Sequence, residues 1–254
     1  RRKRRLLLAF IFIGGICFFL FQMSLGTVSI PIDEIIRFFT FRELQTPIYR
    51  TILVDIRFPR LFAGFLIGAL LSLSGVFFQA LLKNPLADPY ILGVSSGGAF
   101  GTVLSIAAFG SGTVLSRFFG NLPLVSFLFS LLAAFLTYFL AKRGKSVPVV
   151  DLILSGVIMN FFFSAATTFV IIYGWRNVSS ATFWLLGSLS GARWEQVPPL
   201  LFIAGVGLLI GFALSKTLNA ISLGEEEAKN VGIEVERVKL FLFITGTLVA
   251  AYTI

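Results

Sequence analysis

The sequence predicts an all-α protein, a polytopic bundle of transmembrane helices, on two observations. The first is composition: 57% of the 254 residues are hydrophobic, 13% are charged, and the mean hydropathy is +0.93. A soluble domain of this length cannot bury so much apolar surface in one core. The second is that the apolar residues gather in runs close to the roughly 20 residues that a helix needs to cross a bilayer. Lipid is therefore the predicted surrounding of most of the chain.

Apolar runs divide the chain into six complete predicted spans and an incomplete seventh. Asp, Glu, Lys and Arg occur only at the ends of these runs. The runs are Leu6–Met23, Leu61–Leu82, Ile91–Phe109, Leu122–Ala141, Leu152–Tyr173 and Pro199–Ser215, with the seventh opening at Leu240. We interpret residues 1–254 as a single transmembrane domain of about seven spans. Because the seventh run stops at Ile254 and the chain does not begin with methionine, we expect a piece truncated at its C-terminus.

Basic residues set the predicted orientation. Arg1–Arg5 precede the first run, which is about 18 residues long and has no A-x-A-like site after it, so an uncleaved helix is favoured over a signal peptide. The positive-inside rule then places the N-terminus in the cytoplasm. Alternation of the spans puts Lys83, the segment 142–145 and the segment 216–239 on the same side, where most basic residues collect.

Small residues recur at helical spacing inside the runs and predict close helix packing. Such stripes let helix backbones approach in a bilayer, where lipid gives helices no hydrophobic reason to associate. The candidate packing residues, spaced four apart, are Gly64 and Gly68, then Gly93, Gly97 and Gly101. Another stripe contains Asn160 among aliphatic residues. Its pattern fits either an interhelical hydrogen bond or a residue of a transport path.

Residues 29–60, which the topology places outside, contain an amphipathic helix. Apolar side chains repeat with helical spacing at Ile32, Ile35, Ile36 and Phe39. This pattern is typical of a helix lying on the membrane surface. The segment ends in "YRTILVDIRFPR", which places three arginines at the outer mouth of the second span: Arg50, Arg57 and Arg60. Outer arginines either extend to lipid headgroups or dock a partner, and the pattern alone allows both.

Residues 219–239 form a hydrophilic loop on the predicted cytoplasmic side. Ser222 and Glu225 have the three-residue spacing of a capping box, and Gly232 is a candidate for the residue just past the helix end. Three successive glutamates would lie at the positive end of the helix dipole. The predicted helix is short, about two turns. It is interpreted either as a protein-facing handle or as a connector.

Absent residues exclude several kinds of chemistry. There is no G-x-x-x-x-G-K-[ST] motif, so the chain has no P-loop, and no ionisable residue lies inside a run, where proton-coupled transporters usually need one. Cys17 is the single cysteine and there is no histidine, which excludes an internal disulfide and a His/Cys metal site. The net charge of +9 lies in clusters beside the runs and indicates anionic lipid rather than nucleic acid. Any energy must come from a partner.

The block from Arg57 to Gly101 resembles a known family. It reads "RFPRLFAGFLIGALLSLSGVFFQALLKNPLADPYILGVSSGGAFG" and contains, in order, R-x-P-R, S-G-x-x-x-Q and N-P-L-A-D-P-x-x-L-G-x-S-S-G. These motifs are similar to those of the FecCD-type permeases, the membrane subunits of ATP-binding cassette importers for iron-siderophores, haem and cobalamin. The resemblance also covers Leu152–Ala165, Phe183–Val197 and Ser222–Lys239, and so nearly the whole chain.

The resemblance implies an assembly. Ten helices per subunit are expected, with two permease subunits, as a homodimer, around a central path. Two cytoplasmic ATPase subunits would bind ATP and Mg, and a substrate-binding protein would dock outside. The implied location is the cytoplasmic (inner) membrane of a bacterium or archaeon, and the expected cargo is a metal chelate, with ferric siderophore as the first choice. The chain itself would hold no cofactor, metal or nucleic acid and would catalyse no reaction.

The family motifs also imply roles for residues. Arg57 and Arg60 match arginines that meet acidic residues of the binding protein. The corner Asn84, Pro85 and Leu86 matches a region near the cytoplasmic gate. The helix that couples the permease to the ATPase matches Ser222, Leu223, Gly224, Glu225, Glu226, Glu227, Ala228 and Gly232.

The chain departs from the family pattern at one place, and two rival functions stay open. Family members continue with a G-P-I-G-F-V-G-L block and three further helices, which are absent before the chain ends at Ile254. A secondary transporter or passive channel would work without an ATPase. A membrane scaffold would need neither a path nor a gate.

Overall fold

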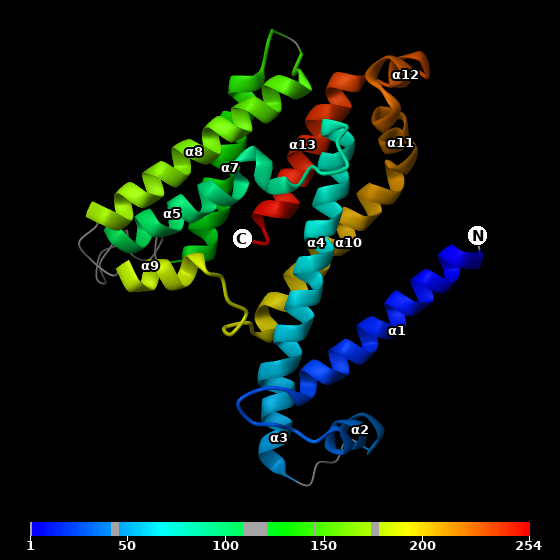
Figure 1. Cartoon of the computed structure of the whole chain (residues 1–254), viewed down its shortest axis with the longest axis vertical. Helices are drawn as coiled ribbons and strands as arrows, with labels where there is room; N and C mark the ends of the chain where they lie inside the picture. The colour runs from blue at the N-terminus through cyan, green and yellow to red at the C-terminus, as the bar shows by residue number, and fades with distance from the viewer. Residues whose placement is uncertain (1, 42–45, 109–120, 145, 174–177) are drawn as a thin grey trace. The chain divides into compact units, whose positions relative to one another are not determined.

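The computed structural model describes residues 2–41, 46–108, 121–144, 146–173 and 178–254 (Figure 1). The elements formed by these residues are helices, and apart from an isolated bridge between Arg143 and Ser146 they include no strand. Within these described ranges, five helices are long and apolar enough to cross a membrane. The predicted all-α, polytopic class is therefore confirmed. Phe109, the predicted end of the third run, and Lys145 lie outside the described residues.

The chain divides into two compact units. The first consists of Arg1–Leu66 with Leu189–Leu200, and the second of Ile67–Ser188 with Leu201–Ile254. The elements of the first are α1 (Arg2–Ser24), α2 (Ile32–Phe41), α3 (Pro47–Thr51), a π-helical turn (Ile52–Arg57), the start of α4 (Phe58–Leu82) and the 3-10 turn η3 (Trp194–Gln196).

A small core holds the first unit together. It is formed by Met23, Ile30, Ile35 and Leu53, with Phe19 and Phe58 against it. The predicted amphipathic helix is confirmed as α2, but its apolar residues are divided: Ile35 is buried, whereas Ile32, Ile36 and Phe39 are exposed. Indole Nε1 of Trp194 donates to the Val54 carbonyl at 2.7 Å and fixes the second segment of this unit to the first.

The second predicted span begins earlier than expected. Instead of starting at Leu61, the helical segment runs from Pro47 to Leu82, 36 residues, well above the roughly 20 that cross a bilayer. Pro59 lies within this helical segment, although proline removes a backbone donor and its ring crowds the preceding turn. Here a π-helical turn, Ile52–Arg57, lies directly before it, and this wider turn accommodates the ring without ending the helix.

The second unit is built on three helices that lie side by side: α5 (Val94–Ala108), α7 (Leu122–Ala141) and α8 (Val149–Tyr173) (Figure 1). Its core includes Phe78, Leu81, Leu92 and Phe243. The remaining elements are the 3-10 turn η2 (Pro89–Leu92), α9 (Val178–Leu185), α10 (Val197–Ala213), α11 (Ser215–Leu223), α12 (Glu225–Asn230) and α13 (Val235–Ala251).

Two of the predicted runs differ from the helices observed. The third does not form one long helix, because Gly93 adopts a left-handed φ of +82° between η2 and α5. Within the described residues, α5 covers Val94–Ala108, 15 residues, or about 22 Å at 1.5 Å per residue. Helix α13, which corresponds to the seventh predicted run, begins at Val235 rather than at Leu240, so its first turns carry charged residues.

The glycines predicted to pack helices have different surroundings. A Cβ on Gly97 would lie 2.4 Å from the Ala133 Cβ, and one on Gly101 would lie 2.4 Å from the Phe129 ring, so α5 and α7 approach closely at both positions. A Cβ on Gly64 would lie 3.2 Å from Leu189. No described atom lies within 4 Å of the corresponding position at Gly68.

Candidate functional site

The candidate site begins after the apolar helix α10, which ends at Ala213. The chain passes through α11 and turns at Gly224 into α12, a helix of six residues. Gly232 follows α12 with a left-handed φ of +84°. The N–H of Gly232 donates to the Lys229 carbonyl at 2.9 Å, and that of Ile233 to the Ala228 carbonyl at 3.0 Å. These two bonds form a Schellman motif, which confirms Gly232 as the residue just past the helix end.

The predicted capping box is wrong. Ser222 still lies within α11, and its hydroxyl donates to the Asn219 carbonyl at 2.9 Å. Helix α12 has Gly224 at its N-cap, without a side-chain hydrogen bond to its first turn. Ser and Thr side chains compete for nearby backbone acceptors in this way when they lie inside a helix. The spacing of Ser222 and Glu225 therefore had the pattern of a cap without the geometry.

Glu225, the first residue of α12, instead takes part in an ion-pair cluster. Its Oε1 lies 3.3 Å from Nζ of Lys83, just past the end of α4, and 3.2 Å from Nζ of Lys239 in α13. Lys239 Nζ also lies 2.8 Å from Oε1 of Glu236. The other oxygen of Glu236, Oε2, accepts the N–H of Val147 at 3.1 Å, just before α8. We call Lys83, Glu225, Glu236 and Lys239 the ion-pair cluster.

The ion-pair cluster lies against a polar cavity. The cavity has a volume of about 350 Å³, and its walls include all four charged side chains together with residues of the segment before and at the start of α8: Ser146, Pro148, Val149 and Val150. Although Lys239 lines this cavity, it is only 4% exposed. A buried ammonium group is stable where opposite charges surround it, as the two carboxylates do here.

Electrostatics keep the Glu225 carboxylate charged. Burial acts to raise its pKa, but hydrogen bonds and charge attraction from Lys239 and Lys83 outweigh it, and the pKa lies below the ordinary value of 4.5. The pKa of Glu225 is lower in the folded protein than in the unfolded chain. Ionisation of Glu225 therefore stabilises the fold fully at pH values above its ordinary pKa, and this stabilisation is lost as the pH falls through its pKa in the folded protein. At neutral pH the cluster is therefore fully ionised at Glu225.

Sequence reasoning found Glu225 but missed its partners. The signal for the Glu236–Lys239 pair was their i, i+3 spacing, which brings side chains together on a helix. The contacts from Glu225 to Lys83 and Lys239 join residues far apart in the chain, so no local pattern marked them.

The outer surface of this segment is both apolar and acidic. Leu223 is 79% exposed and Val231 is 70% exposed, on either side of Glu226 and Glu227, which are also exposed. Ala228 faces inward, with the buried Leu218 and Ile221 of α11. Exposed apolar side chains on a polar segment make this surface a candidate for binding a partner.

The corner after α4 is held by its own polar side chains. Asn84 Oδ1 accepts the N–H of Leu86 at 2.9 Å, and Asp88 Oδ1 accepts those of Tyr90 and Ile91 at 2.7 and 3.1 Å. Leu86 is 85% exposed. Pro85 lies between Asn84 and Leu86 in the turn. The gate role implied for Asn84, Pro85 and Leu86 stays a prediction.

Asn160 of α8 connects to the same region. Its Nδ2 donates to the carbonyls of Tyr90 and Ile91, each at 3.0 Å, and its Oδ1 accepts the hydroxyl of Ser96 at 2.8 Å. These contacts satisfy carbonyls at the break between η2 and α5. Of the two interpretations left open by the sequence, the structure shows the interhelical hydrogen bond.

The two arginines predicted to dock a binding protein have different environments. Arg57 is buried, and its guanidinium donates to the carbonyls of Met23 and Val28, near the end of α1. Arg60 is half-buried and donates through Nη2 to the Ser190 carbonyl at 3.1 Å. Docking by Arg57 and Arg60 stays a prediction, and for Arg57 it would require the side chain to leave two backbone acceptors.

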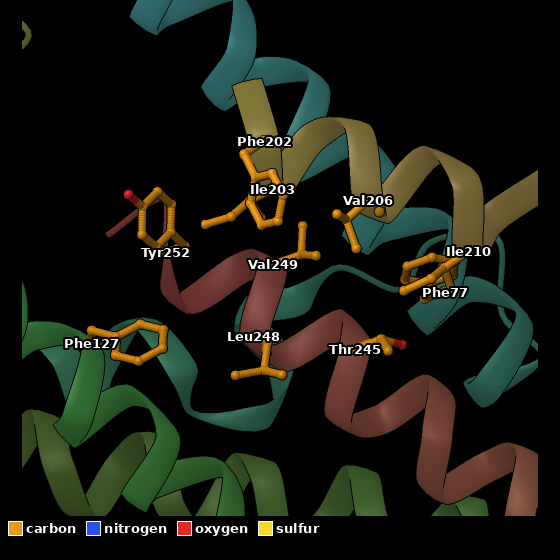
Figure 2. A pocket seen from close by; sticks show the side chains of 11 residues that line it. Phe77, Phe127, Phe202, Ile203, Val206, Ile210, Thr245, Leu248, Val249 and Tyr252 are labelled. Atoms are coloured by element: carbon orange, nitrogen blue, oxygen red, sulfur yellow. The ribbon is translucent and has the colours of Figure 1, made fainter. Parts of the chain in front are cut away.

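An apolar cavity lies elsewhere in the second unit (Figure 2). Its volume is about 260 Å³. Side chains of α4, α7, α10 and α13 line it: Phe77, Phe127, Phe202, Ile203, Val206, Ile210, Thr245, Leu248, Val249 and Tyr252, with Gly207. Figure 2 shows the aromatic rings of Phe77, Phe127, Phe202 and Tyr252 around it. Such a surface suits apolar groups and offers no charged ligand.

Comparisons with known proteins find relatives over nearly the whole chain. The model of the FecCD transport family matches residues 11–254. The chain is 35% identical to the cobalamin import system permease protein BtuC of Halobacterium salinarum, over 80% of this chain and 53% of that protein. It is 32% identical to the iron(3+)-hydroxamate import system permease protein FhuG of Bacillus subtilis, over 98% of this chain and 74% of that protein.

A solved structure gives the same result for the fold. It is of a transporter described as a metal-chelate type ABC transporter, in an inward-facing conformation, with a TM-score of 0.75 and 30% sequence identity. The match covers 97% of this chain and 74% of that one. The chain spans 53% to 65% of the length of three of the curated relatives that it matches.

Proposed function

Since the chain belongs to the FecCD transport family, we propose that it is the membrane-spanning permease subunit of an ATP-driven importer. The importer takes up a metal chelate that a substrate-binding protein delivers from outside. ATP and Mg are bound by a separate ATPase subunit, and the permease carries out no covalent chemistry. Two ATPase subunits work on a pair of permease subunits, proposed to be a homodimer.

One observation carries this proposal: α12 is a polar helix that presents an outer surface while ion pairs hold it to the ends of apolar helices. Its Glu225 contacts Lys83 after α4 and Lys239 in α13. Its exposed neighbours, Leu223, Glu226 and Val231, leave an apolar and acidic surface for a soluble partner. A helix with these two connections is suited to pass movement from a cytoplasmic motor to the membrane.

The proposed mechanism is alternating access. ATP binding and hydrolysis move the ATPase surface that covers α12, and the movement tilts the helices to which α12 is attached. The path between the two permease subunits then opens to one side and closes to the other. Asn84, Pro85 and Leu86 would lie at its cytoplasmic end, because irregular backbone at membrane depth is tolerated where it lines a cavity or is buried in protein.

The proposed location is the cytoplasmic (inner) membrane of a bacterium or archaeon, crossed several times, with the N-terminus in the cytoplasm. The five long apolar helices support the multiple crossings. The cluster of basic residues at the start of α1 and the lysines of the ion-pair cluster support the orientation, since basic residues concentrate on the cytoplasmic side.

We propose a ferric siderophore as the cargo. The likeness to FhuG, which is named for iron(3+)-hydroxamate import, supports this choice. That match covers 98% of the chain. The likeness to a cobalamin permease supports the broader class of large metal chelates. Uptake competition between a ferric hydroxamate and cobalamin in cells that depend on this permease distinguishes the two.

Leu223→Asp is expected to weaken ATPase binding about tenfold, because a central apolar contact of an interface contributes at least that much. The matched control is Leu186→Asp, since Leu186 is 76% exposed, close to the 79% of Leu223, but lies between the fifth and sixth predicted spans, a segment that alternation of the spans places on the opposite side from Leu223. The measurement is co-purification of the ATPase subunit with the permease in detergent. Equal recovery of the ATPase with both variants would contradict the proposal that this surface binds it.

A further inference from the structure

We propose that Lys239 is a positioning residue of this transporter: it joins α12 rigidly to α13 through Glu225, so that movement of α12 becomes movement of the membrane helix. The inference rests on the proposed function and adds to it a residue that transmits the movement. Lys239 lies outside the segment implied for ATPase contact, in the second turn of α13.

Helix α12 depends on its attachments for its position. With six residues it is far shorter than the 12 to 15 or so that a helix needs to be even marginally stable alone. Its inward face is held by the buried side chain of Ala228 and by the Schellman motif that returns the chain to α13. Its first turn is held by Glu225, which contacts Lys83 and Lys239. The position of the first turn of α12 is therefore set by its contacts with the ammonium groups of Lys83 and Lys239.

Of the two lysines, Lys239 provides the more rigid connection. Its side chain is 5% exposed, whereas that of Lys83 is 31% exposed. Its Nζ lies between carboxylates of two elements, 3.2 Å from Glu225 of α12 and 2.8 Å from Glu236 of α13. Separation of α12 from α13 would leave Lys239 with Glu236 alone and would break its buried contact with Glu225, and this cost opposes the separation. The Lys239–Glu225 ion pair therefore keeps α12 and α13 together when either helix moves.

The same helix carries a natural control. Arg237 Nη1 lies 2.8 Å from Glu234 Oε2, but these side chains are 82% and 65% exposed. Exposed pairs of this kind contribute little to stability, because water and salt screen them. Arg237→Met thus removes a cation two residues from Lys239 without affecting the connection to α12.

The test uses the complete transporter in proteoliposomes, with ATPase subunits and binding protein, and ferrichrome as the probe. Lys239→Met is expected to lower the substrate transported per ATP hydrolysed about tenfold, the effect of losing a strong charged contact. Lys239→Arg is expected to restore most of the ratio, since the cavity of about 350 Å³ beside Lys239 leaves room for a guanidinium. Arg237→Met is expected to keep the wild-type ratio. In detergent, the amides of α12 are expected to exchange about tenfold faster in Lys239→Met than in Arg237→Met.

The outcomes separate the two proposals. If the wild type transports but Lys239→Met keeps its ratio, or its α12 amides stay as protected as in Arg237→Met, the role of Lys239 is overturned and the transport function stands. If the wild type shows no ATP-dependent uptake, the transport function fails, and amide exchange alone decides whether Lys239 holds α12. Should Lys239→Met fail to assemble, Glu225→Gln neutralises the same ion pair from α12. A normal ratio in Glu225→Gln also overturns the inference.

Discussion

Gly97→Val is expected to disrupt the packing of α5 against α7 and to lower the stability of the protein. A Cβ at this position would lie 2.4 Å from the Ala133 Cβ and 2.7 Å from the Phe129 carbonyl oxygen. The second contact is with backbone, which has no rotamer to change. Overpacking of this kind costs about 1–3 kcal/mol or more. The measurement is the midpoint of thermal unfolding in detergent, together with the yield of folded protein.

Gly68→Val is the matched control, because the sequence placed Gly68 and Gly97 in stripes of the same type. No described atom lies within 4 Å of a Cβ at Gly68, and the substitution is expected to leave the midpoint unchanged. Valine also has a slightly better helix propensity than glycine. A similar loss of stability in both variants would contradict the claim that the close α5–α7 contact makes Gly97 sensitive to substitution.

Arg57→Met is expected to be the most damaging change in the first unit. The guanidinium donates to the carbonyls of Met23 and Val28, and Met23 lies in the last turn of α1, where carbonyls have no partner inside the helix. Hydrogen bonds from a charged donor contribute about 1.5–3 kcal/mol each, so the loss of two is expected to cost about 3 kcal/mol or more. The measurement is unfolding in detergent, as for Gly97.

Arg60→Met provides the comparison, since Arg60 makes one bond to the Ser190 carbonyl from a half-buried position. A small change in stability is expected there. Binding of the substrate-binding protein at two salt concentrations is measured alongside, because a docking arginine acts through charge that salt screens. Normal stability of Arg57→Met with weakened, salt-dependent docking would contradict the structural role of Arg57 and favour the docking role.

The helical class and most spans could be predicted because they depend on local properties. Leu122–Ala141 was predicted with the same bounds that α7 has, since Asn121 caps it and the run has charges only outside it. The long helix from Pro47 could not be predicted, because charged residues up to Arg60 precede the apolar run and a π-helical turn has no sequence signal. The break at Gly93 was also missed, since the same glycine fits a packing stripe.

The candidate site was predicted as a short helix, which the structure shows as α12, but its contacts were not predicted. The acidic turn and Gly232 are local signals, and both lie where the sequence placed them. The cap at Ser222 failed because the serine bonds within α11. Lys83 and Lys239 become partners of Glu225 only when α4, α12 and α13 are brought together, and no spacing in one helix reveals such a contact.

Uptake of ferrichrome by proteoliposomes that hold the complete transporter tests the central claim most directly: cytoplasmic ATP hydrolysis, acting through α12, drives substrate through these helices. Uptake is expected to require the ATPase subunit and hydrolysable ATP, and to stop when a non-hydrolysable analogue replaces ATP. Equal uptake without the ATPase or after removal of ATP would contradict the claim and would identify a passive channel or a secondary transporter.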